Sequence, residues 1–143
     1  MWKLQFDGGA RPNPGKASCA FRLTCPDGTM VERAWTMKGI NTNNDAEYEA
    51  AVTGIEKARA MAPTGAQLTV VGDSMLVIMQ LSGAWKVREP RLFGYVRRAR
   101  ACAADLKITY RHVPREKNDD MDMLVREARA KSDSMDELLA DAL

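Results

Sequence analysis

The sequence predicts an α/β domain built on a five-stranded mixed sheet, and three observations lead to this prediction. Apolar and polar side chains alternate over residues 2–6, 17–24 and 29–37, as is typical of half-buried strands. The connections between these segments are short, so we expect an antiparallel meander. After residue 47 helical and strand-like segments alternate, which indicates parallel strands joined by helical crossovers. The expected order is β-β-β-α-β-α-α-β-α, with helices flanking the sheet.

Turn residues bound the first three strands. We expect the first strand to end at Asp7, because two glycines and two prolines follow within residues 8–15. Residues 25–28, Cys-Pro-Asp-Gly, have the composition of a hairpin turn. The returning strand is expected to place three side chains in the core: Met30, Trp35 and Met37.

The rest of the chain contains four predicted helices and two predicted strands. A long helix begins within residues 41–47 and ends before Pro63, which cannot continue it. Further helices are expected over residues 74–81, 90–104 and from 118, with strands over 67–72 and 107–112 parallel to the first. We expect residues 1–130 to form the folded domain and residues 131–143 to form an acidic, partly helical C-terminal tail.

Length and composition favour one globular domain in a reducing compartment. The chain has 143 residues and 45% hydrophobic content, enough for one core. It contains no apolar run long enough to cross a membrane and no signal-peptide pattern, so we expect a cytoplasmic protein. The three cysteines have no metal-binding spacing, which predicts buried thiols rather than disulfides or a zinc site.

Positive charge is concentrated in one segment. Residues 86–100 contain six lysines and arginines and one glutamate, a net charge of +5, although the whole chain carries only +2. This basic segment favours contact with a polyanion such as a nucleic acid. A solvated helix face is the alternative, and the sequence leaves it open.

Four carboxylates are expected at one edge of the sheet. Asp7 and Asp73 follow predicted neighbouring strands, and Glu47 and Asp122 lie in the first turns of two helices. Three of them have structural alternatives: Glu47 in a capping box that starts at Asn44, Asp73 as a helix cap, and Asp122 beside a helix dipole. Clustered carboxylates repel one another unless cations separate them. Oxygen ligands alone suit Mg²⁺ or Mn²⁺, and two such ions about 3.5–4 Å apart promote phosphodiester cleavage.

The motifs that contain these acids resemble those of one known family. They are Phe6-Asp7-Gly8-Gly9, Asn13-Pro14-Gly15, residues 42–47 (Thr-Asn-Asn-Asp-Ala-Glu), Gly72-Asp73-Ser74 and residues 115–122 (Arg-Glu-Lys-Asn-Asp-Asp-Met-Asp). Together they resemble ribonuclease H type 1 over residues 2–130. The resemblance implies the ribonuclease H-like fold and metal-dependent cleavage of the RNA strand in an RNA–DNA hybrid, which leaves 3′-hydroxyl and 5′-phosphate ends. It also implies two Mg²⁺ ions, with Mn²⁺ as a substitute.

The resemblance assigns roles by position. Metal binding and catalysis would fall to Asp7, Glu47, Asp73 and Asp122. Contacts with the hybrid near the 2′-hydroxyls would fall to Asn13, Asn43, Asn44 and Ser74, and contacts with the DNA strand to Trp85, Lys86 and the rest of the basic segment. His112 has the spacing of a catalytic histidine in bacterial-type members, or else it ends its strand as a structural residue.

Two other functions are compatible with the sequence. The chain could be a domain that binds RNA–DNA hybrids or structured RNA without cleaving them, but the presence of all four acids argues against this. It could also be another nuclease of the wider superfamily, such as a resolvase or exonuclease, although the asparagine motifs suit ribose recognition. We expect a monomer that binds an RNA–DNA hybrid, without a membrane or an obligate protein partner.

Overall fold

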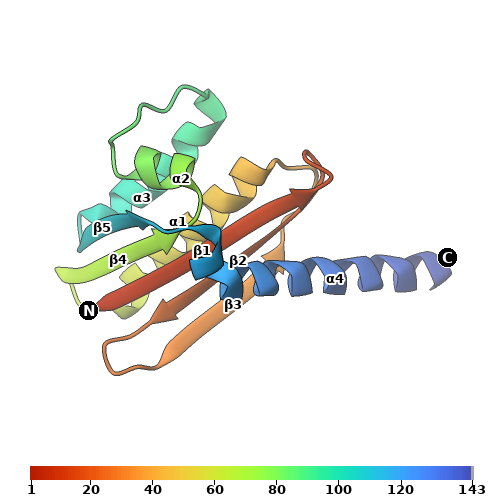
Figure 1. Cartoon of the computed structure of the whole chain (residues 1–143), viewed down its shortest axis with the longest axis horizontal. Coiled ribbons are helices and arrows are strands. Elements are labelled where there is room, and N and C mark those ends of the chain that lie inside the picture. The colour runs from red at the N-terminus through yellow and green to blue at the C-terminus, as the bar shows by residue number, and fades with distance from the viewer. Residues whose placement is uncertain (143) are drawn as a thin grey trace.

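A computed structural model describes residues 1–142 and shows a five-stranded mixed sheet with helices on both faces (Figure 1). The strand order is β3-β2-β1-β4-β5. β1 pairs antiparallel with β2 and parallel with β4, and β5 is parallel to β4. The predicted fold is therefore confirmed. The strands are β1 (Trp2–Arg11), β2 (Lys16–Thr24), β3 (Met30–Thr36), β4 (Ala66–Gly72) and β5 (Leu106–His112).

The helices form two layers around the sheet. α1 packs on β1 and β2, and α4 packs across β2 and β3 from the other side (Figure 1). α3 lies beside α1. The predicted helix over 90–104 begins as a 3-10 turn, and the predicted loop after β5 contains a second one. The helices are α1 (Asn43–Met61), α2 (Met75–Leu81), η1 (Pro90–Leu92), α3 (Phe93–Ala103), η2 (Arg115–Asn118) and α4 (Asp119–Ala142).

The main core lies between the sheet and α1. It includes the fully buried side chains of Leu4, Phe6, Phe21, Tyr48, Ile55 and Val70. The three cysteines are buried free thiols, as predicted. Trp35 packs its ring edge against Phe21, with ring centroids 6.0 Å apart, and Met37 is half-buried. Met30 is 57% exposed, so its predicted core position is wrong. It pairs with Thr24 at the start of β3, the outermost strand of the sheet.

β1 is longer than predicted. It continues through Gly8 and Gly9 to Arg11, because β2 pairs with it along the whole stretch, from Lys3↔Thr24 to Arg11↔Lys16. This continuous ladder overrides the preference of glycine for turns. The parallel pairing with β4, however, stops at Gln5↔Val71. Asp7 is therefore not the end of its strand, but it does lie just beyond the end of the parallel pairing.

Two glycines allow the elements around Asp7 to approach closely. A Cβ atom on Gly8 would overlap the main chain of α1, lying 2.6 Å from the Glu47 nitrogen. A Cβ atom on Gly72 would overlap the ring of Phe6. The start of α1 thus rests directly on β1, and the end of β4 rests on the Phe6 ring. These contacts bring three predicted site residues, at positions 7, 47 and 73, to one edge of the sheet.

α4 is one continuous helix from Asp119 to Ala142. Its last turns extend past the sheet (Figure 1), so residues 131–142 are helical, and residue 143 lies outside the described residues. The division into a domain over 1–130 and a tail over 131–143 stays a prediction. Lys16 at the start of β2 forms ion pairs with Asp133, at 2.8 Å, and with Asp136. Within residues 1–142, no helix combines the length and apolar character needed to span a membrane.

Candidate active site

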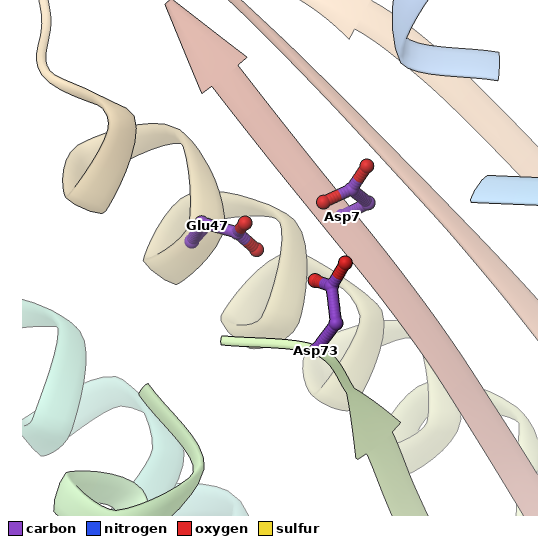
Figure 2. Close-up of side chains that lie close together, drawn as sticks. All are labelled: Asp7, Glu47 and Asp73. Carbon is purple, nitrogen blue, oxygen red and sulfur yellow. The ribbon is translucent and has the colours of Figure 1, made fainter. Parts of the chain in front are cut away.

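Three carboxylates from three different elements meet at the edge of the sheet. Asp7 lies on β1, Glu47 lies in the second turn of α1, and Asp73 directly follows β4. Each contributes one oxygen to a group whose members all lie within 4.8 Å of one another. Figure 2 shows the three side chains pointing toward a common centre. Asp122, in the first turn of α4, lines the same cleft.

Neighbouring residues, not the clustered acids, cap the helices. Thr42 is the N-cap of α1: its side chain accepts from the Asp45 nitrogen at 3.1 Å, and the Asp45 carboxylate accepts from the Thr42 nitrogen at 3.0 Å. The predicted capping box from Asn44 to Glu47 is therefore wrong. Ser74 is the N-cap of α2, so the alternative role for Asp73 is wrong as well. The carboxylates of Glu47 and Asp73 remain directed at the cleft.

A buried asparagine connects β1 to the start of α4. The Asn118 side chain is 1% exposed and donates a hydrogen bond from Nδ2 to the Phe6 carbonyl oxygen at 2.8 Å. That carbonyl lies just past the last parallel pair of β1 and β4. The Asn118 amide therefore satisfies a main-chain oxygen of β1 beyond the end of the pairing with β4. This bond fixes the helix that carries Asp122 next to Asp7.

Burial and mutual repulsion raise the pKa values of the clustered acids. Burial, and then the charge of Asp73, raise the pKa of Asp7 to about 7. Burial, followed by the charges of Asp7 and Asp73, raises the pKa of Glu47 well above its usual value. Burial also raises the pKa of Asp73, and the nearby Arg115 guanidinium offsets part of that rise. The protein therefore holds these carboxylates in an arrangement that disfavours their ionised forms.

The donor set fits a divalent metal ion. One oxygen of the Glu47 carboxylate, Oε2, is buried and has no hydrogen-bond partner among the described residues. A buried carboxylate oxygen without a partner is costly, and a cation would satisfy it. The cluster contains only carboxylates, without histidine or cysteine, which is typical of sites for hard cations such as Mg²⁺ rather than zinc.

The cleft around the acids also contains four arginines that the sequence analysis did not assign to the site. It has a volume of about 420 Å³ and is lined by all four predicted acids as well as by Arg11, Arg115, Arg126 and Arg129. Arg126 pairs with Asp122, with Nε and Oδ2 3.1 Å apart. A signal for two of them was present, because positions 122, 126 and 129 share one face of a helix.

The predicted hybrid-binding polar residues surround this cleft. Asn43, Asn44 and Ser74 line it, whereas Asn13 does not line it but contacts Asn43. Asn13 Oδ1 accepts from the Asn43 nitrogen at 3.0 Å, and Asn43 Oδ1 accepts from the Ala10 nitrogen at 2.7 Å. Because main-chain donors occupy both side-chain oxygens, each Nδ2 group faces away and keeps its donors for other partners.

His112 lies next to the cluster but does not line the cleft. It is the last residue of β5, and its exposed ring places Nε2 3.2 Å from the main-chain oxygen of Asp73. Because a carbonyl oxygen only accepts, Nε2 must carry the proton in this contact. Nδ1 is then the basic nitrogen of the neutral ring. The structure thus gives His112 a contact with the main chain of Asp73, and its catalytic role stays a prediction.

The basic segment divides into two parts. Arg98 pairs with Glu49 at 3.2 Å and with Glu56 at 2.6 Å, and Arg91 pairs with Asp45 at 3.0 Å. Through these ion pairs the two arginines bind the basic segment to α1. Three of the remaining cations line a groove of about 660 Å³ between α2 and α3. They are Lys86, Arg97 and Arg100, and Trp85 and Phe93 line the groove with them.

The groove and the acidic cleft adjoin each other. Arg88 lines a neighbouring hollow together with Trp85 and Lys86, and Asn44 lines both this hollow and the acidic cleft. Trp85 is 46% exposed. The two predicted binding regions are therefore neighbouring parts of one surface, joined at the first turn of α1.

Comparisons with known proteins agree with this geometry. The family model described as "Reverse transcriptase-like" matches residues 5–128. Ribonuclease HI of Halobacterium salinarum is 38% identical over 128 residues, which cover 86% of this chain and 61% of that protein. A bifunctional protein of Mycobacterium tuberculosis is 37% identical over 127 residues. The chain spans only 34% of the length of this second relative.

Solved structures are similar over nearly the whole chain. The N-terminal RNase H domain of the Mycobacterium tuberculosis protein has a TM-score of 0.83 at 34% identity, covering 94% of this chain and 97% of that one. LC11-RNase H1, solved in complex with an RNA/DNA hybrid, has a TM-score of 0.84 at 32% identity. The similarity covers 92% of this chain and 99% of that structure.

Proposed function

This chain belongs to the ribonuclease H type 1 family, and on that premise we propose that it is an endoribonuclease that hydrolyses the RNA strand of RNA–DNA hybrids. The observation that carries the proposal is the convergence of Asp7, Glu47 and Asp73, with Asp122 lining the same cleft. A domain that only bound hybrids would gain nothing from four carboxylates, since they repel its polyanionic ligand.

The four acids would hold two Mg²⁺ ions, with Mn²⁺ as a possible substitute. When bound, these ions supply the positive charge that orients an attacking water and stabilises the leaving 3′-oxygen, which gives 5′-phosphate and 3′-hydroxyl ends. The protein contributes rigid placement, because Asp7 and Glu47 project from main chains that touch at Gly8. Asn118 holds the helix of Asp122 against β1 in the same way.

Recognition of RNA would come from the amides beside the cleft. Asn13 and Asn43 present Nδ2 donors, because main-chain N–H groups occupy their oxygens. Asn44 and Ser74 add further polar groups to the lining of the cleft, and Asn44 also lines the neighbouring hollow that contains Arg88. Such groups can bond to a 2′-hydroxyl, which distinguishes a ribose from a deoxyribose. In this arrangement Trp85, Lys86, Arg97 and Arg100 would hold the phosphates of the DNA strand.

His112 would handle a proton near Asp73. Its Nε2 is engaged with the Asp73 carbonyl, so Nδ1 is the atom that can take up a proton. The test compares His112→Ala with the wild type in kcat and in hybrid affinity. A loss of kcat at unchanged affinity supports the role, whereas an unchanged kcat leaves His112 a structural strand end.

One gel assay tests the main proposal. Labelled RNA–DNA hybrid, duplex DNA and duplex RNA are each incubated with the protein and Mg²⁺, Mn²⁺ or EDTA. We expect cleavage of the RNA strand in the hybrid only when metal is present, and mass spectrometry of the fragments should show 5′-phosphates. Robust cleavage of duplex DNA would instead indicate another nuclease of the superfamily.

An Asp73→Asn variant separates cleavage from binding. Asp73 lies in a turn and caps no helix, so the variant should fold normally and still bind the hybrid. Turnover should be lost, because one ligand oxygen of the cluster is replaced by an amide that binds cations weakly. A wild-type rate in this variant would remove Asp73 from the mechanism.

A further inference from the structure

Two rows of side chains lead away from the acidic cluster along the cleft. On β1, positions 7, 9 and 11 share one face because successive strand residues alternate. On α4, positions 122, 126 and 129 share one face because they are four and three residues apart. Each row begins with an acid and ends with an arginine: Asp7 to Arg11 on β1, and Asp122 to Arg129 on α4.

The rows touch at Gly9. Arg129 donates from Nη2 to the Gly9 main-chain oxygen at 3.4 Å, and a Cβ atom on Gly9 would lie 3.4 Å from the same nitrogen. The rows reach about 13 Å from Asp7 to Arg11 and about 10 Å from Asp122 to Arg129, from the rise per residue of a strand and a helix. The arginine end of the cleft is therefore clearly separated from the acidic end.

No carboxylate is in direct contact with the arginine end. Arg129 Nε is buried without a hydrogen-bond partner, and neither Arg11 nor Arg129 forms an ion pair with any residue from 1 to 142. Burial, and then the charge of Arg11, lower the pKa of Arg129, and the charges of Asp122 and Asp133 offset only part of this. Other partly buried arginines behave differently: Arg22 and Arg98 each pair with two acids.

We propose that Arg11 and Arg129, assisted by Arg126, form an anion subsite that binds a backbone phosphate of the RNA strand next to the scissile one. The inference rests on the proposed function, because the strand must pass from the acidic cluster to this end of the cleft. The subsite orients the strand but does not contact the reacting atoms, so these arginines are positioning residues. The subsite ends further along α4, where Asp133 and Asp136 pair with Lys16 one and two turns after Arg129. These carboxylates would repel a second phosphate.

The test combines arginine variants with hybrids that carry one neutral linkage. Arg11→Met, Arg129→Met and the double variant are compared with Arg59→Met, a control whose arginine pairs with Asp105 and does not line the cleft. One methylphosphonate is moved along the RNA strand at 2′-O-methyl nucleotides, and in a second series along the DNA strand; each RNA hybrid is compared with one that has the same 2′-O-methyl nucleotide and an ordinary phosphodiester. Kinetics are measured at several salt concentrations. Hybrid binding is measured by fluorescence anisotropy in an Asp73→Asn background.

We expect the double variant to raise KM and the dissociation constant about tenfold, and to change kcat less than twofold. The slope of log affinity against log salt concentration should become shallower by the amount expected for one phosphate contact. The affinity of the wild type should also fall about tenfold when the hybrid has a neutral linkage at one flanking RNA position. The affinity of the double variant should not fall further with that linkage. Arg129→Lys, which keeps the charge, should retain part of the binding.

Three outcomes would overturn the inference. They are an unchanged KM and salt dependence in the double variant, equal losses in Arg59→Met, and a sensitive linkage on the DNA strand instead of the RNA strand. Failure of the proposed function looks different, because the wild type would then leave the unmodified hybrid uncut while the anisotropy series still reports on the subsite. If Arg129→Met unfolds, Arg11→Met alone applies the test, since Arg11 is exposed.

Discussion

Replacing Asp7 with Asn should stabilise the metal-free protein at alkaline pH. Burial and the Asp73 charge raise the pKa of Asp7 from 3.8 to about 7. In the folded state this carboxyl therefore binds its proton more tightly than in the unfolded chain. The free-energy cost of ionising Asp7 in the folded state is absent below pH 3.8. It grows between pH 3.8 and pH 7 and reaches its full size above pH 7. A shift of about three pKa units corresponds to about 4 kcal/mol of unfolding free energy.

Asn removes this charge but keeps the shape of the side chain. Part of the gain is offset, since the neutral Asn oxygen accepts a weaker hydrogen bond from Glu47 than the Asp7 carboxylate does, a loss of about 1–2 kcal/mol. We expect a net stabilisation of about 2–3 kcal/mol at pH 8 in EDTA and a much smaller difference at pH 5. Added Mg²⁺ should narrow the difference, because it stabilises the wild type more than Asp7→Asn.

Urea unfolding followed by tryptophan fluorescence measures the effect at pH 5 and pH 8, with EDTA or Mg²⁺. Asp119→Asn is the matched control, because it removes the same charge from an exposed position in the first turn of α4. The reasoning is refuted if the advantage of Asp7→Asn does not grow between pH 5 and pH 8, or if the control shows the same growth.

Three further predictions concern packing, capping and the basic segment. Gly8→Ala should lower the free energy of unfolding by about 2–4 kcal/mol, because the added methyl group overlaps the main chain of α1. In the same urea assay Gly94→Ala, in open space on α3, should be neutral or slightly stabilising. Thr42→Ala removes the N-cap of α1 and should lower stability by about 1 kcal/mol, seen as an earlier thermal transition. Arg98→Met should lower stability by about 1 kcal/mol without changing hybrid affinity, whereas Arg97→Met should weaken binding without changing stability; the opposite pattern would contradict the division of the basic segment.

The sheet and its order could be predicted from the sequence because the pattern there is local. Alternating side chains define the strands, short turns define the meander, and the handedness of crossovers places β4 beside β1 and β5 beside β4. The extent of β1 could not be predicted. Gly8 and Gly9 are turn formers by composition, but pairing with β2 over residues 3–11 keeps them in the ladder, and the composition of residues 8–15 alone does not reveal that pairing.

The convergence of the acids was predictable from topology, but the environment of the cleft was not. Ends of parallel strands meet at one edge, and this rule places Asp7 beside Asp73. The arginines that share the cleft escape such a rule, because Arg11 faces α4 only after two distant elements have packed together. The same holds for the basic segment: residues 86–100 look uniformly cationic, yet acids on α1 neutralise Arg91 and Arg98. Sequence patterns show charge, whereas only packing shows which charges are already paired.

The contact at Gly8 also bears on which cations the cluster could accept. Since the main chains of β1 and α1 are already in contact there, the interval between Asp7 and Glu47 cannot shrink, and any widening would have to lift the whole helix off the sheet. Main chains with a fixed spacing favour small ions with strict coordination geometry over Ca²⁺, which takes longer bonds and more ligands. Redesign toward a larger ion would therefore have to begin at the glycine, not at the carboxylates.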